Sequence, residues 1–164
     1  MSLKERLRRQ LVSARETSER YLQDFTTPEA WTAKVHPNAN HAMWFAGHMA
    51  NTDNFFISIV SPQRAVERPG FAEKFGVGSY PTSEPSDYPP VEDVLAFMRE
   101  RRAVLLEIFD SVAEEDFTNP TPEGTPHFLA DIGSVFEMAV WHEGLHSGQL
   151  SVTRRSLGFD PAFR

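Results

Sequence analysis

The sequence predicts an all-α fold, a four-helix bundle with a long irregular connection between the second and third helices. Four segments carry apolar residues at helical spacing, and no alternating apolar run is long enough to indicate a strand. Residues 61–89, which separate the second and third segments, are rich in proline and glycine. At 164 residues the chain is long enough to bury one core, so we expect a single domain over residues 1–164.

The first two helices are expected at about residues 2–25 and 38–60. In the first, Leu3, Leu7 and Leu11 begin an apolar stripe between charged residues, and Thr26-Thr27-Pro28 ends it. The second helix ends at Ser61-Pro62. Its broad inward face is predicted to carry Trp44, Phe45, His48, Thr52, Phe55, Phe56 and Ile59.

The third helix is expected at about residues 91–112, directly after Pro89-Pro90. Three of its arginines, Arg99, Arg101 and Arg102, are interpreted as a solvated face. The preceding connection, residues 61–89, contains several aromatic residues, which favour a segment packed over the bundle. A second loop spans residues 113–133. Long connections of this kind indicate a bundle that is not simply up-down-up-down.

The fourth helix, at about residues 134–157, has the clearest end signals. Ser134 and Glu137 fit a capping box at its start. Two arginines, 154 and 155, occupy the last turn, where they complement the helix dipole. Gly158 then suits the left-handed position after a helix, and Pro161 prevents its continuation.

Composition and charge limit the classes of function that the chain can have. The net charge of −7 argues against a nucleic-acid groove, and the absence of cysteine excludes disulfides, thiolate metal sites and a cysteine nucleophile. The charged start MSLKERLRRQ lacks the apolar stretch of a secretory signal, and no apolar run approaches the roughly 20 residues that span a bilayer. We therefore expect a cytoplasmic protein with no membrane or nucleic-acid partner.

Residues 142–146, His-Glu-Gly-Leu-His, match the H-E-x-x-H motif of zinc proteases, whose glutamate takes a proton from the metal-bound water. Such proteases need a third ligand downstream. In the extended motif H-E-x-x-H-x-x-G-x-x-H, a glycine and a third histidine follow the second histidine, but here these positions hold Gln149 and Val152. The only acid after His146 is Asp160, beyond the expected helix end. A zinc protease is therefore the less favoured interpretation.

His48 is the natural third ligand, because it lies on the inward face of the second helix. His142 and His146 are one turn apart and can grip a single ion. Three imidazoles from two helices would leave coordination positions open, as in a catalytic metal site. The alternative is that these histidines only pack in the core. Short residues flank the motifs and would let two helices approach closely: Gly47, Ala50, Gly144, Ser147 and Gly148.

Other polar residues are candidates for the same site. Glu143 is a candidate general base, although its position turns it about 100° from the ligand face; the alternative is a surface carboxylate or one that supports the ligands. Gln149 shares a face with both histidines and could hydrogen-bond an imidazole or a substrate. Asn51, Thr52 and Trp44 could hold His48 or contact a substrate.

The sequence resembles the DinB-like superfamily. The resemblance rests on His48 within WFAGHMANTDNFF, on HEGLHSGQLSVTRRSLG, and on FGVGSYP followed by DYPPVEDV. It implies a single-domain DinB-like four-helix bundle, commonly a homodimer, that holds a divalent metal with His48, His142 and His146. Related families include metal-dependent transferases that use low-molecular-weight thiols such as bacillithiol or mycothiol.

Two hypotheses follow. The first is a metal-dependent thiol S-transferase or hydrolase that acts on a small molecule, with Zn, Ni or Fe as the metal and a low-molecular-weight thiol as a possible cosubstrate. A metal would lower the pKa of water or of an incoming thiol near neutral pH. The second is a non-catalytic bundle in which the histidines bind metal or merely pack. Neutral imidazoles accept several divalent metals, so the sequence does not choose among them.

Overall fold

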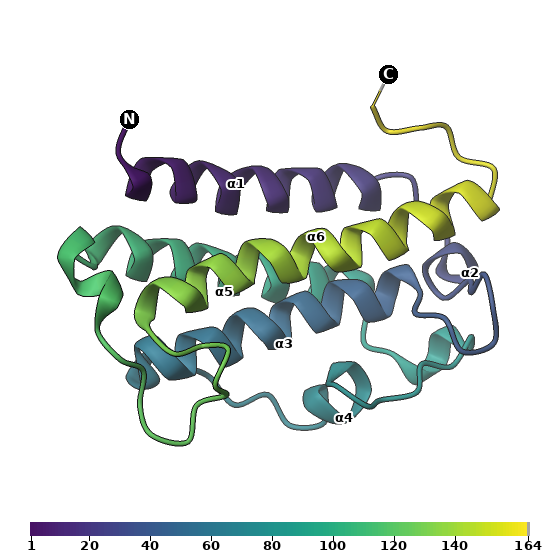
Figure 1. Ribbon diagram of the computed structural model, residues 1–164. Coiled ribbons are helices and arrows are strands. Elements are labelled where there is room, and N and C mark those ends of the chain that lie inside the picture. Colours follow the sequence, from purple (N-terminus) through teal and green to yellow (C-terminus); the bar gives the residue numbers. More distant parts are fainter. Residues whose placement is uncertain (164) are drawn as a thin grey trace.

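The computed structural model describes residues 1–163, and within them four long helices form the bundle (Figure 1). These are α1 (Leu3–Leu22), α3 (Ala42–Val60), α5 (Val91–Ser111) and α6 (Ile132–Ser156). Short helices lie in the connections: α2 (Pro28–Trp31), η1 (Pro62–Arg64), α4 (Phe71–Phe75), η2 (Pro85–Asp87) and η3 (Glu114–Thr118). No helix of this part of the chain is both long and apolar enough to cross a membrane. The all-α bundle predicted from the sequence is confirmed.

The long helices do not alternate in direction. Figure 1 shows α3 and α5 running in the same direction, opposite to α1 and α6. α3 packs against both α5 and α6, and α1 packs against α6 and α5. The long connection 61–90 makes this order possible, because it returns the chain to the end of the bundle at which α3 begins. The predicted departure from up-down-up-down topology is therefore confirmed.

Two helix starts differ from the prediction. The second long helix begins at Ala42 rather than near residue 38, because the side chain of His41 accepts a hydrogen bond from the backbone N–H of Trp44 (3.0 Å) and caps the helix. The fourth begins at Ile132, and its capping box pairs Asp131 with Ser134. The predicted capping box from Ser134 to Glu137 is therefore wrong: Ser134 is the third residue of the first turn, not the cap.

The end of α6 agrees with the prediction. Gly158 has φ +83°, and its backbone N–H donates to the carbonyl of Arg155, while that of Phe159 donates to the carbonyl of Arg154. Paired bonds of this kind close a helix at a left-handed residue. The buried guanidinium of Arg154 also donates to the carbonyl of Tyr21, which ties the end of α6 to the end of α1.

The connection between α3 and α5 packs on the bundle, as its aromatic residues predict. Phe71 and Phe75 of α4 are buried against α3. The hydroxyl of Tyr88 lies 3.1 Å from Nε2 of His41, which joins the end of the connection to the start of α3. The connection 61–90 is therefore anchored on the bundle by Phe71, Phe75 and Tyr88 and is not a free linker.

Two apolar clusters fill the bundle, and a layer of buried charge lies between them. Each long helix contributes one member to this layer, which we call the ion cluster: Arg15, Asp53, Arg102 and Glu143. On every helix the charged residue falls between the positions that belong to the two apolar clusters. The helices therefore meet through ion pairs at mid-length and through apolar contacts on either side.

Every charge of the ion cluster has a partner. Arg102 donates to both carboxylate oxygens of Asp53 at 2.9 Å. Arg15 donates to Asp53 at 3.0 Å and to Oε1 of Glu143 at 2.7 Å. Nη2 of Arg102 also lies 2.7 Å from Oε2 of Glu143, close enough for an ion pair, although this oxygen accepts no well-oriented hydrogen bond within the described residues.

The predicted solvated face of α5 is wrong for two of its three arginines. Arg99 is exposed and pairs with Glu19 on α1. Arg101 and Arg102 are buried: Arg101 donates to the carbonyl of Arg64, and Arg102 belongs to the ion cluster. Arg101 also pairs with the adjacent Glu100, but Arg64, Asp53 and Glu143 lie far away in the sequence, so local charge patterning could not reveal the burial.

The ion cluster predicts a large loss of stability on removal of one member. Asp53→Ala leaves two buried guanidinium groups without the carboxylate between them, so we expect the free energy of unfolding to fall by about 3–5 kcal/mol. Urea denaturation followed by circular dichroism measures this. Arg8→Ala is the control, because it breaks the exposed pair with Asp110 and should cost no more than about 1 kcal/mol. Equal losses in the two variants would contradict this interpretation of the ion cluster.

Candidate metal centre

Three imidazoles converge where α3 faces α6. Nε2 of His48 lies 3.1 Å from Nε2 of His142, and the ring centroids of His142 and His146 are 4.5 Å apart. One ring nitrogen from each of the three residues lies within 4.8 Å of the others. The structure thus brings together the three histidines that the sequence predicts as ligands.

In His48 and His146, neighbouring hydrogen-bond acceptors determine which ring nitrogen has a lone pair available for a metal. Nδ1 of His48 lies 2.7 Å from the carbonyl oxygen of Phe75, and Nδ1 of His146 lies 3.0 Å from Oε1 of Gln149. A carbonyl oxygen can only accept, so both Nδ1 atoms carry the proton, and both Nε2 atoms present a lone pair. This is the arrangement by which proteins orient histidine ligands.

The three rings are held in the neutral form that binds metals. Burial lowers the pKa of His48 to about 4. Burial, together with the neighbouring His146 and His48, lowers the pKa of His142 to about 3. Burial also lowers the pKa of His146, although the hydrogen bond to Gln149 opposes this. At pH 7 all three imidazoles therefore keep an unprotonated nitrogen.

The donor set and its spacing fit a divalent metal ion. Two nitrogens that bind one tetrahedral ion at 2.0–2.1 Å lie about 3.3 Å apart, close to the 3.1 Å between His48 and His142. The His48 nitrogen is a lone-pair acceptor, so the short contact needs either a proton on His142 or a cation shared by the two. The residues present therefore suit a three-histidine site.

Trp44 and Gln149, both predicted near the site, contact the ligand rings. The indole of Trp44 stacks on His48 with ring centroids 4.2 Å apart, and its Nε1 donates to the hydroxyl of Ser79 at 2.7 Å. Gln149 accepts from His146 and also, at 3.4 Å, from Asn40. These contacts restrict rotation of the imidazoles.

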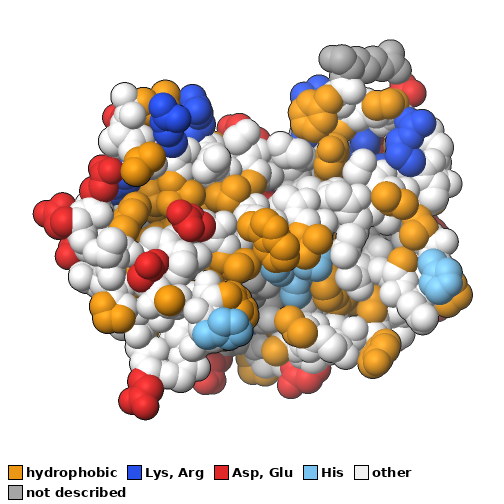
Figure 2. Space-filling model, viewed as in Figure 1, with side chains coloured by type: hydrophobic (Ala, Val, Ile, Leu, Met, Phe, Trp, Pro, Cys, Tyr) orange, Lys and Arg blue, Asp and Glu red, His pale blue; other side chains and the backbone are white. Residues whose placement is uncertain are grey.

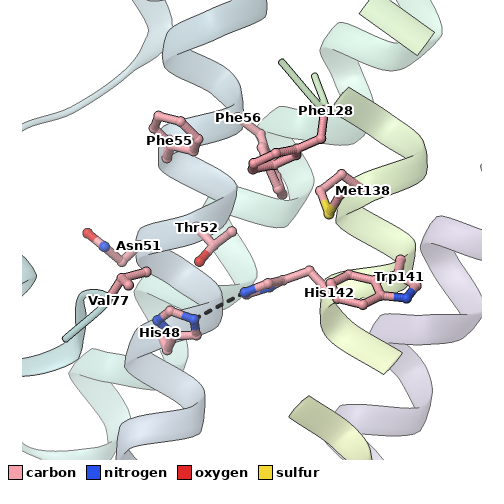
Figure 3. A pocket seen from close by; sticks show the side chains of 10 residues that line it. All are labelled: His48, Asn51, Thr52, Phe55, Phe56, Val77, Phe128, Met138, Trp141 and His142. Atoms are coloured by element: carbon pink, nitrogen blue, oxygen red, sulfur yellow. Dashed lines mark hydrogen bonds between the residues drawn. The ribbon is translucent and has the colours of Figure 1, made fainter. Parts of the chain in front are cut away.

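A cavity of about 630 Å³ opens beside the histidines. His48, Asn51, Thr52 and His142 line one end of it, as Figure 3 shows. The rest of the wall is apolar: Phe55, Phe56, Val77, Phe128, Met138 and Trp141. Figure 2 shows histidine side chains reaching the surface in the middle of one face, next to a group of hydrophobic side chains. Asn51 and Thr52 thus lie in the cavity wall beside the histidines, and the hydrogen bonds of the ligand rings go to other residues.

Glu143, the candidate general base, lies elsewhere. Its carboxylate is fully buried and bound by Arg15 and Arg102 in the ion cluster. Burial alone would raise the pKa of Glu143, but the charges of the two arginines outweigh it and lower the pKa. An ionised carboxylate so bound is a poor proton acceptor, so this environment favours a structural role. It also disfavours a zinc protease, in which the glutamate faces the metal-bound water.

The residues with small side chains that lie next to the histidine ligands in the sequence have different structural roles. A Cβ on Gly47 would lie 2.3 Å from the ring of Phe75, so glycine is required for α4 to pack on α3. A Cβ on Gly144 or Gly148 would meet nothing within 4 Å. The hydroxyl of Ser147 lies 2.8 Å from that of Ser18 on α1. The expectation that the glycines of α6 allow close helix packing is therefore wrong.

Sequence reasoning missed several residues of the site. Phe75 supplies the carbonyl that orients His48, and Val77 follows it in the same connection. Phe128 reaches the cavity from the loop before α6, and Met138 from α6 itself. Residues in a connection give no periodic signal, and only the aromatic content of residues 61–89 indicated that Phe75 packs on the bundle.

The profile of the DinB superfamily matches residues 10–150, which include all three histidines. The chain belongs to the DinB superfamily. This agrees with the resemblance seen in the histidine motifs and with the helical bundle of the superfamily. No curated protein matches the sequence significantly.

The fold also resembles a solved structure, described as the conserved protein of locus from Enterococcus faecalis. The two chains are 18% identical with a TM-score of 0.62, and the match covers 94% of this chain and 96% of the other. At this identity the likeness shows the fold alone. The same helical fold therefore extends over nearly the whole length of both chains.

The packing of Phe75 predicts different effects for two glycine substitutions. Gly47→Ala should displace the Phe75 ring and lower the free energy of unfolding by about 1–3 kcal/mol. It should also weaken the hydrogen bond from His48 to the Phe75 carbonyl, so that the Nδ1 proton signal of His48 is broadened or lost in NMR spectra. Gly148→Ala is the matched control in α6 and should stabilise the helix by up to about 1 kcal/mol. Equal stability of the two variants would refute the requirement for glycine at position 47.

Proposed function

We propose that this DinB-superfamily protein is a metal-dependent enzyme that acts on a small molecule, and that a transfer reaction of a low-molecular-weight thiol suits its site best. The observation that carries the proposal is the convergence of three imidazole nitrogens, with two of the three histidines, His48 and His142, lining one end of an apolar cavity. Three neutral ligands leave positions for other molecules, and the cavity gives access to them. His48, His142 and His146 would hold the metal, with Zn, Ni and Fe all compatible.

The chemistry of the cavity wall favours a thiol over water as the nucleophile. A metal ion at such a site deprotonates a coordinated thiol outright, whereas bound water keeps a pKa near 7. No carboxylate lines the cavity within the described part of the chain, and Glu143 is held by arginines. A nucleophile that needs no protein base therefore fits these residues. The chain has no cysteine, so the thiol would come from a cosubstrate.

The reaction that follows is a substitution. The thiol sulfur forms a bond to an electrophilic carbon, and the leaving group departs with the electron pair of its broken bond. The proton of the thiol passes to the leaving group or to solvent. The chain itself orients the reactants: Trp44, Gln149 and the Phe75 carbonyl fix the imidazoles, while Asn51 and Thr52 face the space in which a substrate would lie.

Other expectations stay predictions: a homodimer, a cytoplasmic location and no nucleic-acid partner. A hydrolase is the other enzyme compatible with three histidines. The alternative of a non-catalytic bundle is supported by the 3.1 Å contact of His48 with His142, which a simple hydrogen bond also explains. The two experiments below separate these possibilities.

Metal content tests the shared premise. Protein purified without a nickel column and then incubated with zinc should bind about one ion per chain, measured by mass spectrometry of the metal after desalting. We expect His142→Ala to lose this ion and the accompanying rise in melting temperature, because two ligands remain. His127→Ala, which changes an exposed loop histidine, should behave as the wild type. Substoichiometric metal in the wild type, without a thermal shift from zinc or nickel, would count against every metal-binding version.

A thiol screen separates enzyme from scaffold. Metal-loaded wild type, His146→Ala and His127→Ala are compared for conjugation of low-molecular-weight thiols to an electrophilic dye. Loss of one ligand should reduce the rate by at least about 100-fold, because the open site is lost along with the metal. Equal rates for wild type and His146→Ala would remove the enzyme proposal. They would leave any measured metal binding intact.

A further inference from the structure

The cavity beside the histidines has the dimensions and composition of a small-molecule site. Its volume of about 630 Å³ lies within the range of about 300–1,000 Å³ that such sites occupy. None of the ten described residues that line it is Lys, Arg, Asp or Glu. A charged group that entered would lose part of its hydration, and no side chain of the cavity wall offers it a counter-charge.

Two side chains at the histidine end have unused hydrogen-bonding capacity. Asn51 and Thr52 are half-buried in the cavity wall, yet neither side chain makes a hydrogen bond within the described residues. The next residues along α3 differ: Asp53 is bound by two arginines, and Asn54 pairs with the backbone of Val66. An amide and a hydroxyl can donate and accept, and they suit an uncharged polar group.

The polar side chains of the cavity lie together at one end. Figure 3 shows His48, Asn51, Thr52 and His142 there, with Val77 and Trp141 beside them, and it shows Phe55, Phe56, Phe128 and Met138 at the other end. A molecule that satisfies both ends has an apolar body and one neutral hydrogen-bonding group. That group would lie against the histidines, where the proposed chemistry takes place.

We propose that this cavity binds the electrophilic substrate, and that this substrate is a mainly apolar, uncharged small molecule whose single polar group lies between Thr52, Asn51 and the histidines. The inference rests on the proposed function and names its substrate class. A thiol cosubstrate with charged groups keeps them outside the cavity. A small molecule in the cavity would give Asn51 and Thr52 the hydrogen-bond partner that they lack among the described residues.

Two fluorescent probes that share one ring system test the class. N-phenyl-1-naphthylamine is uncharged, and 1-anilinonaphthalene-8-sulfonate adds a sulfonate to the same skeleton. Titrated into metal-free protein, the uncharged probe should bind one site at least about tenfold more tightly than the sulfonate. Phe55→Asp should weaken the uncharged probe at least about tenfold, because it introduces a carboxylate into the wall. Equal affinity for the two probes would overturn the proposal.

Leu145→Asp is the matched control for Phe55→Asp. Leu145 is 46% exposed on α6 and Phe55 is 44% exposed on α3, but Leu145 does not line the cavity. Both variants should remain folded, as circular dichroism would show, and Leu145→Asp should bind the uncharged probe as the wild type does. Equal weakening by both substitutions would show that the probe binds elsewhere and would overturn the proposal.

The polar end is tested with 6-propionyl-2-dimethylaminonaphthalene, an uncharged probe with a carbonyl group. Thr52→Val keeps the shape of the side chain but removes the hydroxyl. It should weaken this probe about fivefold, because the carbonyl loses the hydrogen bond that Thr52 donates. Equal binding of the carbonyl probe by both proteins would overturn the predicted orientation.

The result is separable from that of the metal experiments. Probe binding is measured without metal or thiol. If the uncharged probe does not bind, while the metal experiment finds one zinc per chain, only the proposed substrate class is overturned. If the protein binds the uncharged probe but takes up no metal, the proposal of a metal-dependent enzyme is overturned, and that of an apolar binding site stands. Sedimentation at rising protein concentration tests whether a second copy of the chain occupies the cavity instead. Loss of probe binding in step with dimer formation would show that a second copy fills the cavity, against the proposal.

Discussion

The buried charge at mid-bundle restricts how the four helices can pack. In a bundle held by apolar contacts alone, a helix can slide or rotate at a modest cost in free energy, because apolar side chains of similar size make equivalent contacts in the new position. Arg15, Asp53, Arg102 and Glu143 do not allow this, since a displaced charge would be left unpaired in the interior. Glu143 is adjacent to His142 in the sequence, and Asp53 lies five residues beyond His48 on α3. The register that pairs the charges is therefore also the register that brings the imidazoles together.

The long connection supplies a second constraint on the same site. It lets α3 and α5 run in the same direction, and it carries Phe75 back to α3, where the backbone carbonyl fixes the ring of His48. Gly47 leaves room for this contact. A short turn could not perform both tasks, since it would return the chain antiparallel to α3 without covering it. The length of residues 61–90 is thus explained by topology and by the orientation of one ligand.

The sequence predicts local features well and distant pairings poorly. Helical periodicity located the four long helices, Gly158 marked the end of α6, and the spacing of His142 and His146 placed two ligands on one face. The start of α3 was missed because its cap, His41, is held by groups some 40 residues away, at Thr82 and Tyr88. Arg102 resembled a surface residue because Asp53 and Glu143 come from other helices. Nothing in the local sequence encodes such partners.

The H-E-x-x-H letters show how one spacing can serve two architectures. Positions 142 and 146 face α3, and the intervening Glu143 is turned about 100° per residue towards a different neighbour. In a zinc protease that neighbour is the metal-bound water, whereas here it is a pair of arginines. The motif therefore fixes which side chains share a helix face, and the helices packed around it decide what each does. With its carboxylate bound and no cysteine in the chain, the proposed site depends on a metal and a cosubstrate for reactivity, and the protein contributes geometry and an apolar cavity.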